Sequence, residues 1–123
     1  MKASNWFAFV AVVFVGCGGS APPTPANAEV GRAALIRGLD AWKAGERPDA
    51  LKSGADPIYF MDFEWDRGAK LLDYSLESSD VSYGAERRYN GSFTLNVKGK
   101  NVSKRLAYLV GTNKPISVRR EEE

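Results

Sequence analysis

The chain has 123 residues, with one cysteine, no histidine and a formal net charge of +2 from 17 basic and 15 acidic residues. This length allows one domain but not two, and so balanced a charge argues against a nucleic-acid partner. One cysteine and no histidine exclude an intrachain disulfide, a zinc site of the usual Cys/His kind and any histidine-based catalytic triad. We expect no cofactor and no metal site.

The first segment has the features of an export signal. Lys2 gives a positive start, and residues 6–15 (WFAFVAVVFV) form an unbroken apolar run. This run is about half the length that a membrane-spanning helix needs. It therefore predicts a signal peptide and not a transmembrane anchor.

Two cleavage sites compete after this run. The triplet ANA, residues 26–28, has the small residues of a signal peptidase site but lies well beyond the apolar run. The segment FVGC, residues 14–17, abuts the run and resembles the bacterial lipobox, although phenylalanine stands where leucine is usual. We favour cleavage between Gly16 and Cys17 and lipidation of Cys17. A soluble secreted protein, cleaved after the ANA triplet, is the alternative.

The lipobox interpretation divides the chain into four parts. Residues 1–16 are the signal peptide, 17–28 the lipidated cysteine with a Gly/Pro-containing tether, 29–120 the domain and 121–123 a frayed tail. Gly18 follows the cysteine and is not the aspartate that commonly retains lipoproteins in the inner membrane. We therefore expect an exported protein, anchored in the outer membrane and facing the periplasm.

The domain begins with a helical pattern. Leu35, Leu39 and Trp42 fall at positions i, i+4 and i+7, which predicts an amphipathic helix of about four turns. Gly38 lies on or near the same face. A glycine there costs helix propensity but allows a sheet or a second helix to approach closely.

Two short segments that contain proline follow this helix, at residues 46–54 (ERPDALKSG) and 56–68 (DPIYFMDFEWDRG). In the second, Asp56 and Pro57 have the order of a helix cap and a first helical residue. We expect both segments to form short helices or turns that place aromatic side chains on the core. The IYFMDFEW part could also be partly extended.

The rest of the chain alternates apolar and polar residues, which predicts about four antiparallel strands. The apolar positions are Leu72, Tyr74 and Leu76; Phe93, Leu95 and Val97; Val102, Leu106, Tyr108 and Val110; and Ile116 and Val118. Gly99 predicts a tight hairpin between the second and third strands, and Lys104 interrupts the pattern of the third. One helix and a meander with one apolar face predict an α+β fold, with the helix packed on a curved antiparallel sheet.

The chain resembles known families in two ways. The segments AALIRGLDAWKAG, DPIYF, LLDYSLES, GSFTLNVKG and KRLAYLVG resemble the cystatin-like and nuclear-transport-factor-like group of folds. The segments LDAWKAGERPDAL, DPIYF, LLDY and YLVGT look like small uncharacterised lipoproteins of planctomycete-type bacteria. This resemblance implies a cystatin-like domain at the cell envelope but no functional site. The hairpin LNVKG also has Leu95 where inhibitory cystatins have glutamine, so protease inhibition is not implied.

Four residues are candidates for a pocket enzyme. Ketosteroid-isomerase-like members of this fold group use an aspartate base with a tyrosine or a protonated aspartate in an apolar pocket. Asp62, Asp73, Tyr74 and Tyr108 could supply such groups. A small-ligand-binding protein, or an isomerase-like or hydrolase-like enzyme, is therefore the alternative to a non-catalytic protein.

Two further charge patterns have an ordinary structural interpretation, which we favour. Asp62, Glu64 and Asp66 alternate like the start of a calcium loop, but the glycine and the glutamate that such a loop needs further along are missing. The second pattern is a concentration of arginines at Arg87, Arg88, Arg119 and Arg120. They could contact anionic lipid or wall polymer, or protect exposed strands from association.

The sequence thus leads to one main hypothesis. We expect a lipid-anchored envelope protein, held at the membrane through Cys17, whose domain is a non-catalytic binding or structural module. Its partner would be an envelope protein or a wall polymer.

Overall fold

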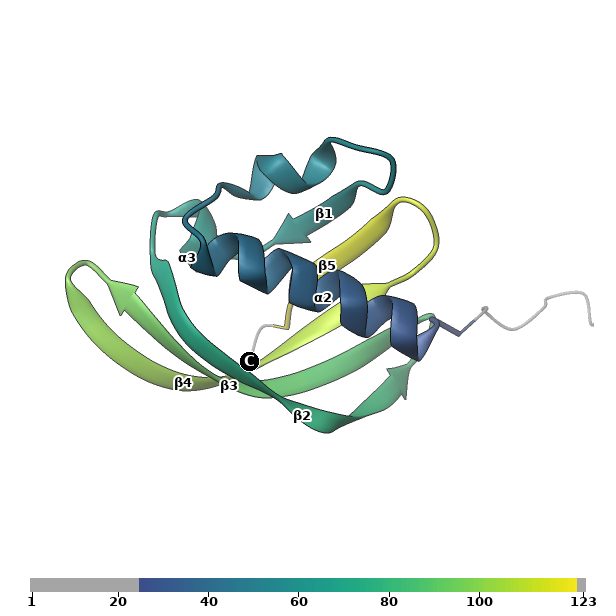
Figure 1. Cartoon of the computed structure of the whole chain (residues 1–123). Coiled ribbons are helices and arrows are strands. Elements are labelled where there is room, and N and C mark those ends of the chain that lie inside the picture. Colours follow the sequence, from purple (N-terminus) through teal and green to yellow (C-terminus); the bar gives the residue numbers. More distant parts are fainter. Residues whose placement is uncertain (1–24, 122–123) are drawn as a thin grey trace, which may run out of the picture.

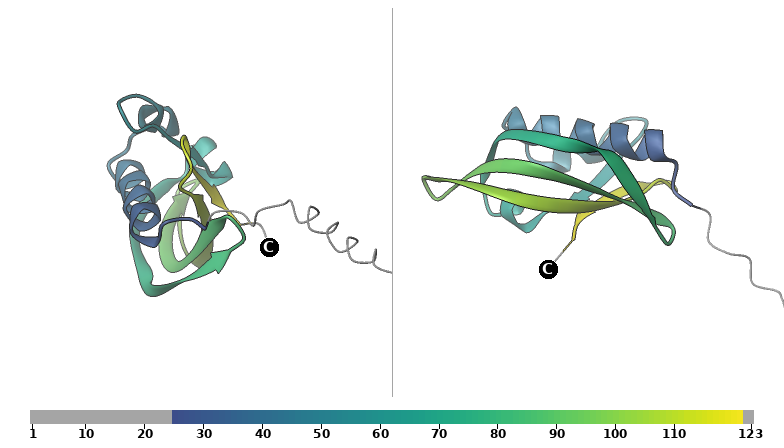
Figure 2. Two further views of the ribbon diagram at one scale, coloured as in Figure 1. Left: turned by 90° about the vertical axis from the view of Figure 1, so that its right-hand side faces the viewer. Right: turned by 90° about the horizontal axis from the view of Figure 1, so that it is seen from below.

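The computed structural model describes residues 25–121. The predicted signal peptide, Cys17 and the last two residues lie outside this range. The elements in chain order are α2 (Ala28–Lys43), the 3-10 helix η1 (Pro48–Lys52), β1 (Ile58–Met61), α3 (Phe63–Asp66), β2 (Lys70–Tyr83), β3 (Glu86–Val97), β4 (Lys100–Gly111) and β5 (Ile116–Arg120). The strands form one curved sheet in the order β1-β5-β4-β3-β2 (Figure 1), with β1 parallel to β5 and the other pairs antiparallel. The α+β prediction is confirmed: α2 packs on one face of a curved sheet (Figure 2).

Helix α2 forms where the apolar spacing predicts it. Asn27 caps its start, since the side-chain Oδ1 accepts a hydrogen bond from the Val30 N–H at 2.9 Å. Leu35, Leu39 and Trp42 are all buried against the sheet. The predicted apolar face of the helix is confirmed.

Gly38 of this helix faces the Phe60 ring of β1. A Cβ atom at this position would lie 2.3 Å from Cδ2 of Phe60 and 2.4 Å from its Cε2. Any larger residue would therefore collide with a buried ring. The expectation that Gly38 allows close packing is confirmed.

The segment after Asp56 and Pro57 follows the partly extended alternative and not the favoured helix or turn. Ile58–Met61 is a strand, β1, which pairs in parallel with Ile116–Arg119 of β5. Its side chains alternate, with Ile58 and Phe60 buried and the two residues between and after them exposed. Helical structure begins only at Phe63, so the sheet has five strands and not about four.

Strand β2 carries a register shift that changes which leucine is buried. Leu72 is 40% exposed, whereas Leu71 is 2% exposed. The pairing with β3 shifts between Leu71 and Asp73, so the alternation of inward and outward side chains is displaced by one residue. Tyr74 therefore lies on the same face of the sheet as Leu71. The expected inward position of Leu72 is therefore wrong, because a bulge interrupts the period of two.

The β3–β4 hairpin has the predicted tight turn. Lys98 and Gly99 form the two-residue loop, with φ angles of 54° and 87°. Positive φ at both positions is the geometry of a type I′ turn, which suits the twist of the flanking strands. Glycine at the second position adopts this geometry without steric cost.

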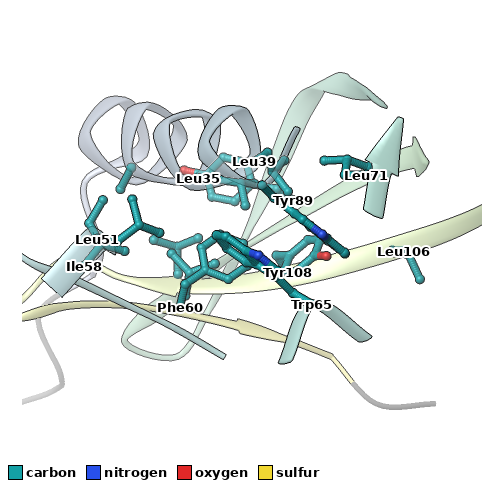
Figure 3. Close-up of a cluster of buried hydrophobic side chains, with 14 of the residues drawn as sticks. Leu35, Leu39, Leu51, Ile58, Phe60, Trp65, Leu71, Tyr89, Leu106 and Tyr108 are labelled. Atoms are coloured by element: carbon teal, nitrogen blue, oxygen red, sulfur yellow. The ribbon is translucent and has the colours of Figure 1, made fainter. Parts of the chain in front are cut away.

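Aromatic rings fill the space between α2 and the sheet (Figure 3). The Trp42 and Trp65 rings are stacked with their centres 5.3 Å apart, and Phe60 meets the Trp65 ring edge-on at 5.1 Å. The centre of the Tyr108 ring lies 5.6 Å from the ring centres of Phe60 and Phe93. Such packed pairs stabilise the fold beyond the burial of their area.

None of the helices in the described range is long and apolar enough to cross a membrane.

Candidate functional site

Asp62 is a buried carboxylate, with 1% of its surface exposed. It is the N-cap of α3, where its Oδ1 accepts hydrogen bonds from the backbone N–H groups of Glu64 at 2.9 Å and Trp65 at 3.2 Å. Its Oδ2 accepts a hydrogen bond from the Tyr108 hydroxyl at 2.6 Å. Because the carboxylate satisfies the free N–H groups at the helix start, it allows this short helix to form against the core.

Two cations reach this site from β4 and β5. Arg120 Nη1 lies 2.6 Å from Glu64 Oε1 and 3.4 Å from Asp62 Oδ1. The guanidinium also lies over the Phe63 ring, 4.5 Å from its centre. Lys104 Nζ lies 3.1 and 3.2 Å from the two carboxylate oxygens of Glu64. We call these two carboxylates, two cations and the Tyr108 hydroxyl the Asp62 network.

The network changes the pKa values of three of its members. Burial, together with the neighbouring Asp62 carboxylate, raises the pKa of Tyr108 well above its ordinary value. Partial burial opposes ionisation of Glu64, but hydrogen bonds from Arg120 and Lys104 outweigh it and lower the pKa of Glu64 below 4.5. Burial opposes the charged form of Arg120, but the hydrogen bond to Glu64 and the nearby Asp62 carboxylate outweigh it and raise the pKa of Arg120 above its ordinary value. Tyr108 thus stays protonated and Glu64 stays ionised at neutral pH.

We predict that Glu64 makes the protein sensitive to acid. Since its pKa is lower in the folded chain, Glu64 contributes stability that is present above its ordinary pKa of 4.5 and is lost as the pH falls through the lowered value. Glu64→Gln should reduce the free energy of unfolding at pH 7 by roughly 1–2 kcal/mol. The difference from the wild type should shrink below pH 4.5, as measured by urea unfolding at several pH values. A difference that is constant with pH would contradict this assignment.

Of the four candidate pocket residues, the structure brings two together and separates the others. Asp62 and Tyr108 are hydrogen-bonded in the interior. The Tyr74 hydroxyl instead donates to Asp40 Oδ1 of α2 at 2.7 Å, and burial and this bond raise its pKa. Asp73 has an exposed side chain, 3.6 Å from Lys43. The four residues do not line one pocket.

The contacts of Asp62 and Tyr108 are those of a structural pair. Both oxygens of Asp62 already accept hydrogen bonds from within the chain, and Tyr108 is fully buried. A general base needs a free oxygen within reach of a substrate proton. The arrangement therefore favours stabilisation of the core over proton transfer.

The acidic residues at 62, 64 and 66 are not arranged as a cation site. Asp62 and Glu64 direct their oxygens at cations and N–H groups of the same chain. Within residues 25–121, no group of three or more metal-binding side chains comes together.

A pocket of about 580 Å³ opens beside the Asp62 network, where β5 ends and β4 continues. It takes side chains from three strands and from α3. Its lining residues are Phe63, Arg88, Asn90, Lys104, Arg105, Leu106, Ala107, Arg120 and Glu121. Four of these are cations and one is an acid, so we call it the cationic pocket.

The four arginines of the arginine-rich segments all pair with carboxylates, two of which are on the sheet. The pairs are Arg87 with Asp80 at 2.6 Å, Arg88 with Glu121 at 2.7 Å, Arg119 with Glu86 at 2.9 Å, and Arg120 with Glu64 at 2.6 Å. Glu121, at the start of the expected tail, also donates its backbone N–H to the Ala107 carbonyl at 2.8 Å. These pairs fasten the ends of the strands, and only Arg88 and Arg120 also line the cationic pocket.

One signal in the sequence indicates this site. Lys104 occupies an inward position of β4, opposite Phe93 of β3, where the alternation calls for an apolar residue. A lysine at such a position needs a carboxylate partner, which is Glu64 here. The arginine pattern includes Arg120 but does not indicate its contact with Asp62 and Glu64, because these partners lie more than fifty positions earlier in the chain.

Comparison of the chain with protein-family models, with curated proteins and with solved structures gives no significant match.

Proposed function

We propose that this chain is a lipid-anchored protein of the bacterial cell envelope that binds an anionic partner through the cationic pocket, without catalysis. The observation that carries this proposal is the pocket of about 580 Å³ with cations from β3, β4 and β5. Cations outnumber acids four to one in its lining, and a cleft in which one sign of charge predominates attracts ions of the opposite sign. The buried Asp–Tyr pair, whose carboxylate oxygens already accept hydrogen bonds within the chain, supports a non-catalytic role.

The start of the fold supports cleavage at Cys17 over cleavage after the ANA triplet. Ala26 is buried, with 7% exposed, and the backbone N–H of Asn27 donates to Thr112 Oγ1 at 3.0 Å. The Ala28 carbonyl accepts a hydrogen bond from the Tyr89 hydroxyl at 2.7 Å. Cleavage after Ala28 would remove the helix cap and both of these bonds. The triplet behaves as part of the domain, which favours the upstream site.

We predict that Cys17→Ser abolishes membrane attachment. With an intact lipobox, the mature protein expressed in a diderm bacterium should incorporate radiolabelled palmitate and sediment with the membranes. Two or three acyl chains anchor a protein stably in a membrane, and a protein without acyl chains lacks this anchor. The Cys17→Ser protein should therefore lack label and be recovered in the soluble fraction. Continued sedimentation of an unlabelled variant in an alkaline wash would contradict the anchor.

Binding to the cationic pocket can be tested with inorganic tripolyphosphate as a simple polyanion. Calorimetry on the mature protein in detergent should detect binding that weakens with salt. The double variant Arg88→Gln/Arg105→Gln should lose it. The matched control Lys52→Gln/Lys114→Gln removes the same charge from residues outside the pocket and should bind as the wild type does. Equal loss in both variants would show a response to net charge only, and would contradict a defined site.

A further inference from the structure

Strand β4 has an open edge beside the cationic pocket. It runs from Lys100 to Gly111, but β5 pairs only with Tyr108–Gly111. The backbone bond from Glu121 to Ala107 extends this pairing by one residue. Within the described range, no strand lies on this side of residues 100–106, and the β3–β4 hairpin extends beyond the end of β5 (Figure 1).

The direction of the backbone groups along this edge follows from one hydrogen bond. The Ala107 carbonyl points away from β3, because it accepts the Glu121 N–H at 2.8 Å. In an antiparallel strand, alternate residues direct their N–H and C=O groups to the same side. Asn101, Ser103 and Arg105 therefore present their N–H and C=O groups along the open edge. The pairing of β4 with β3 is continuous, without a register shift, so this edge is regular.

The other two edges of the sheet are less suited to strand addition. Strand β2 has two register shifts along its length, and the Arg32 guanidinium donates to the Glu77 carbonyl at 2.9 Å. Bulges and covering side chains are ways in which proteins block exposed edges. Strand β1 has only four residues. The open part of β4 is thus the most regular free edge among the described residues.

The charge along this edge is positive. Residues 98–105 (KGKNVSKR) contain four basic residues and no acidic one. Among the described residues, Lys98 and Lys100 form no ion pair. Lys104 forms an ion pair with Glu64, and Arg105 forms one with Glu77. The cationic pocket combines residues from both faces of the sheet, as expected for a groove along an edge and not on a face.

We propose that the open edge of β4 binds an acidic, extended segment of a partner protein, which adds to the sheet as a further strand. This inference rests on the proposed function and names the class of its anionic partner. The partner's backbone would pair with Asn101, Ser103 and Arg105, and its carboxylates would meet Lys100 and Lys104. A second copy of this edge is disfavoured as the partner, because it would bring like charges together across the new strand pair.

A synthetic peptide of about seven residues that alternates glutamate and valine spans the open stretch at about 3.3 Å per residue. We expect the mature protein in detergent to bind this peptide, measured by fluorescence anisotropy. The backbone amides of residues 101, 103 and 105 should become protected from hydrogen exchange, while the amides between them are already protected by β3. A peptide with lysine in place of glutamate should not bind.

Two changes separate strand pairing from attraction by charge. N-methylation of the peptide amides that face β4 keeps every charge, and should weaken binding at least about fivefold. Ser103→Pro removes one N–H of the open edge without touching a bond to β3, and should weaken binding about as much. If this variant fails to fold, the N-methylated peptide still gives the answer with the wild-type protein.

The outcomes distinguish this inference from the function on which it rests. Equal binding of the methylated and the parent peptide would overturn strand addition and leave a charge-driven site. Binding of tripolyphosphate without binding of the peptide would have the same meaning. Failure of both ligands would overturn the anionic binding site itself. Dimerisation of the protein that Ser103→Pro abolishes would show that a second copy occupies the edge, and would also overturn the proposal.

Discussion

Asp62→Ala is expected to lower the free energy of unfolding by about 3–5 kcal/mol, since removing one partner of a buried ion pair has costs of this size. The change leaves the N–H groups at the start of α3 and the Tyr108 hydroxyl without an acceptor. It also leaves Arg120, whose side chain is 9% exposed, with one carboxylate fewer. Urea unfolding followed by tryptophan fluorescence measures the effect directly, because Trp65 follows Asp62 on α3.

Two variants show whether this loss comes from the network. Asp62→Asn keeps an oxygen for the helix cap and should cost less, roughly 1–3 kcal/mol. Asp40→Ala removes an exposed carboxylate that, like Asp62, accepts a hydrogen bond from a tyrosine hydroxyl, here that of Tyr74. It should change the free energy of unfolding by less than about 1 kcal/mol. If Asp62→Ala were no worse than Asp40→Ala, the Asp62 network would not be a main support of the fold.

The parts of the fold that could be predicted are those with a local pattern. The buried face of α2 repeats at helical spacing within one segment, so Leu35, Leu39 and Trp42 identify it. The hairpin between β3 and β4 is fixed by neighbouring residues and by Gly99 in its turn. In both cases the residues that determine the structure are close together in the chain.

The parts that could not be predicted depend on distant residues. Strand β1 pairs with β5, and the paired residues Ile58 and Ile116 are 58 positions apart in the chain. Strand β1 has only four residues, too few to show a clear period of two. The bulge at Leu72 changes the face of a strand without a glycine or proline to mark it. Tertiary pairing decided both features, and it overrode the helical cap signal of Asp56 and Pro57.

The candidate site was predictable only in part, since Asp73 and Tyr74 lie elsewhere. Asp62 and Tyr108 fit the chemistry of a pocket enzyme, and they do meet. Arg120 and Lys104 balance the acidic side chains of Asp62 and Glu64, and the pair serves as an internal support. Charge balance among residues from three separate elements has no signature in a single sequence.

Gly38→Val is expected to destabilise the fold by about 3 kcal/mol, because overpacking a rigid core costs this much. The first added carbon would lie 2.3 Å from Phe60 Cδ2, and two further carbons would follow it. The Phe60 ring cannot move aside easily, since it packs edge-on against Trp65 at 5.1 Å and lies 5.6 Å from Tyr108. The gain in helix propensity over glycine, about 0.5 kcal/mol, is too small to offset this. Thermal and urea unfolding would measure the loss.

The matched control for this change lies on the same helix. Ala33→Val introduces the same side chain at an exposed position and should cost only about 0.5 kcal/mol, which is its helix propensity. The double variant Gly38→Val/Phe60→Leu should lose at least about 1 kcal/mol less free energy of unfolding than the sum of the two single losses. The reason is that leucine is smaller than the phenylalanine ring that the valine would meet. Additive effects of the two changes would show that α2 and β1 do not meet at Gly38, and that another contact sets the distance between helix and sheet.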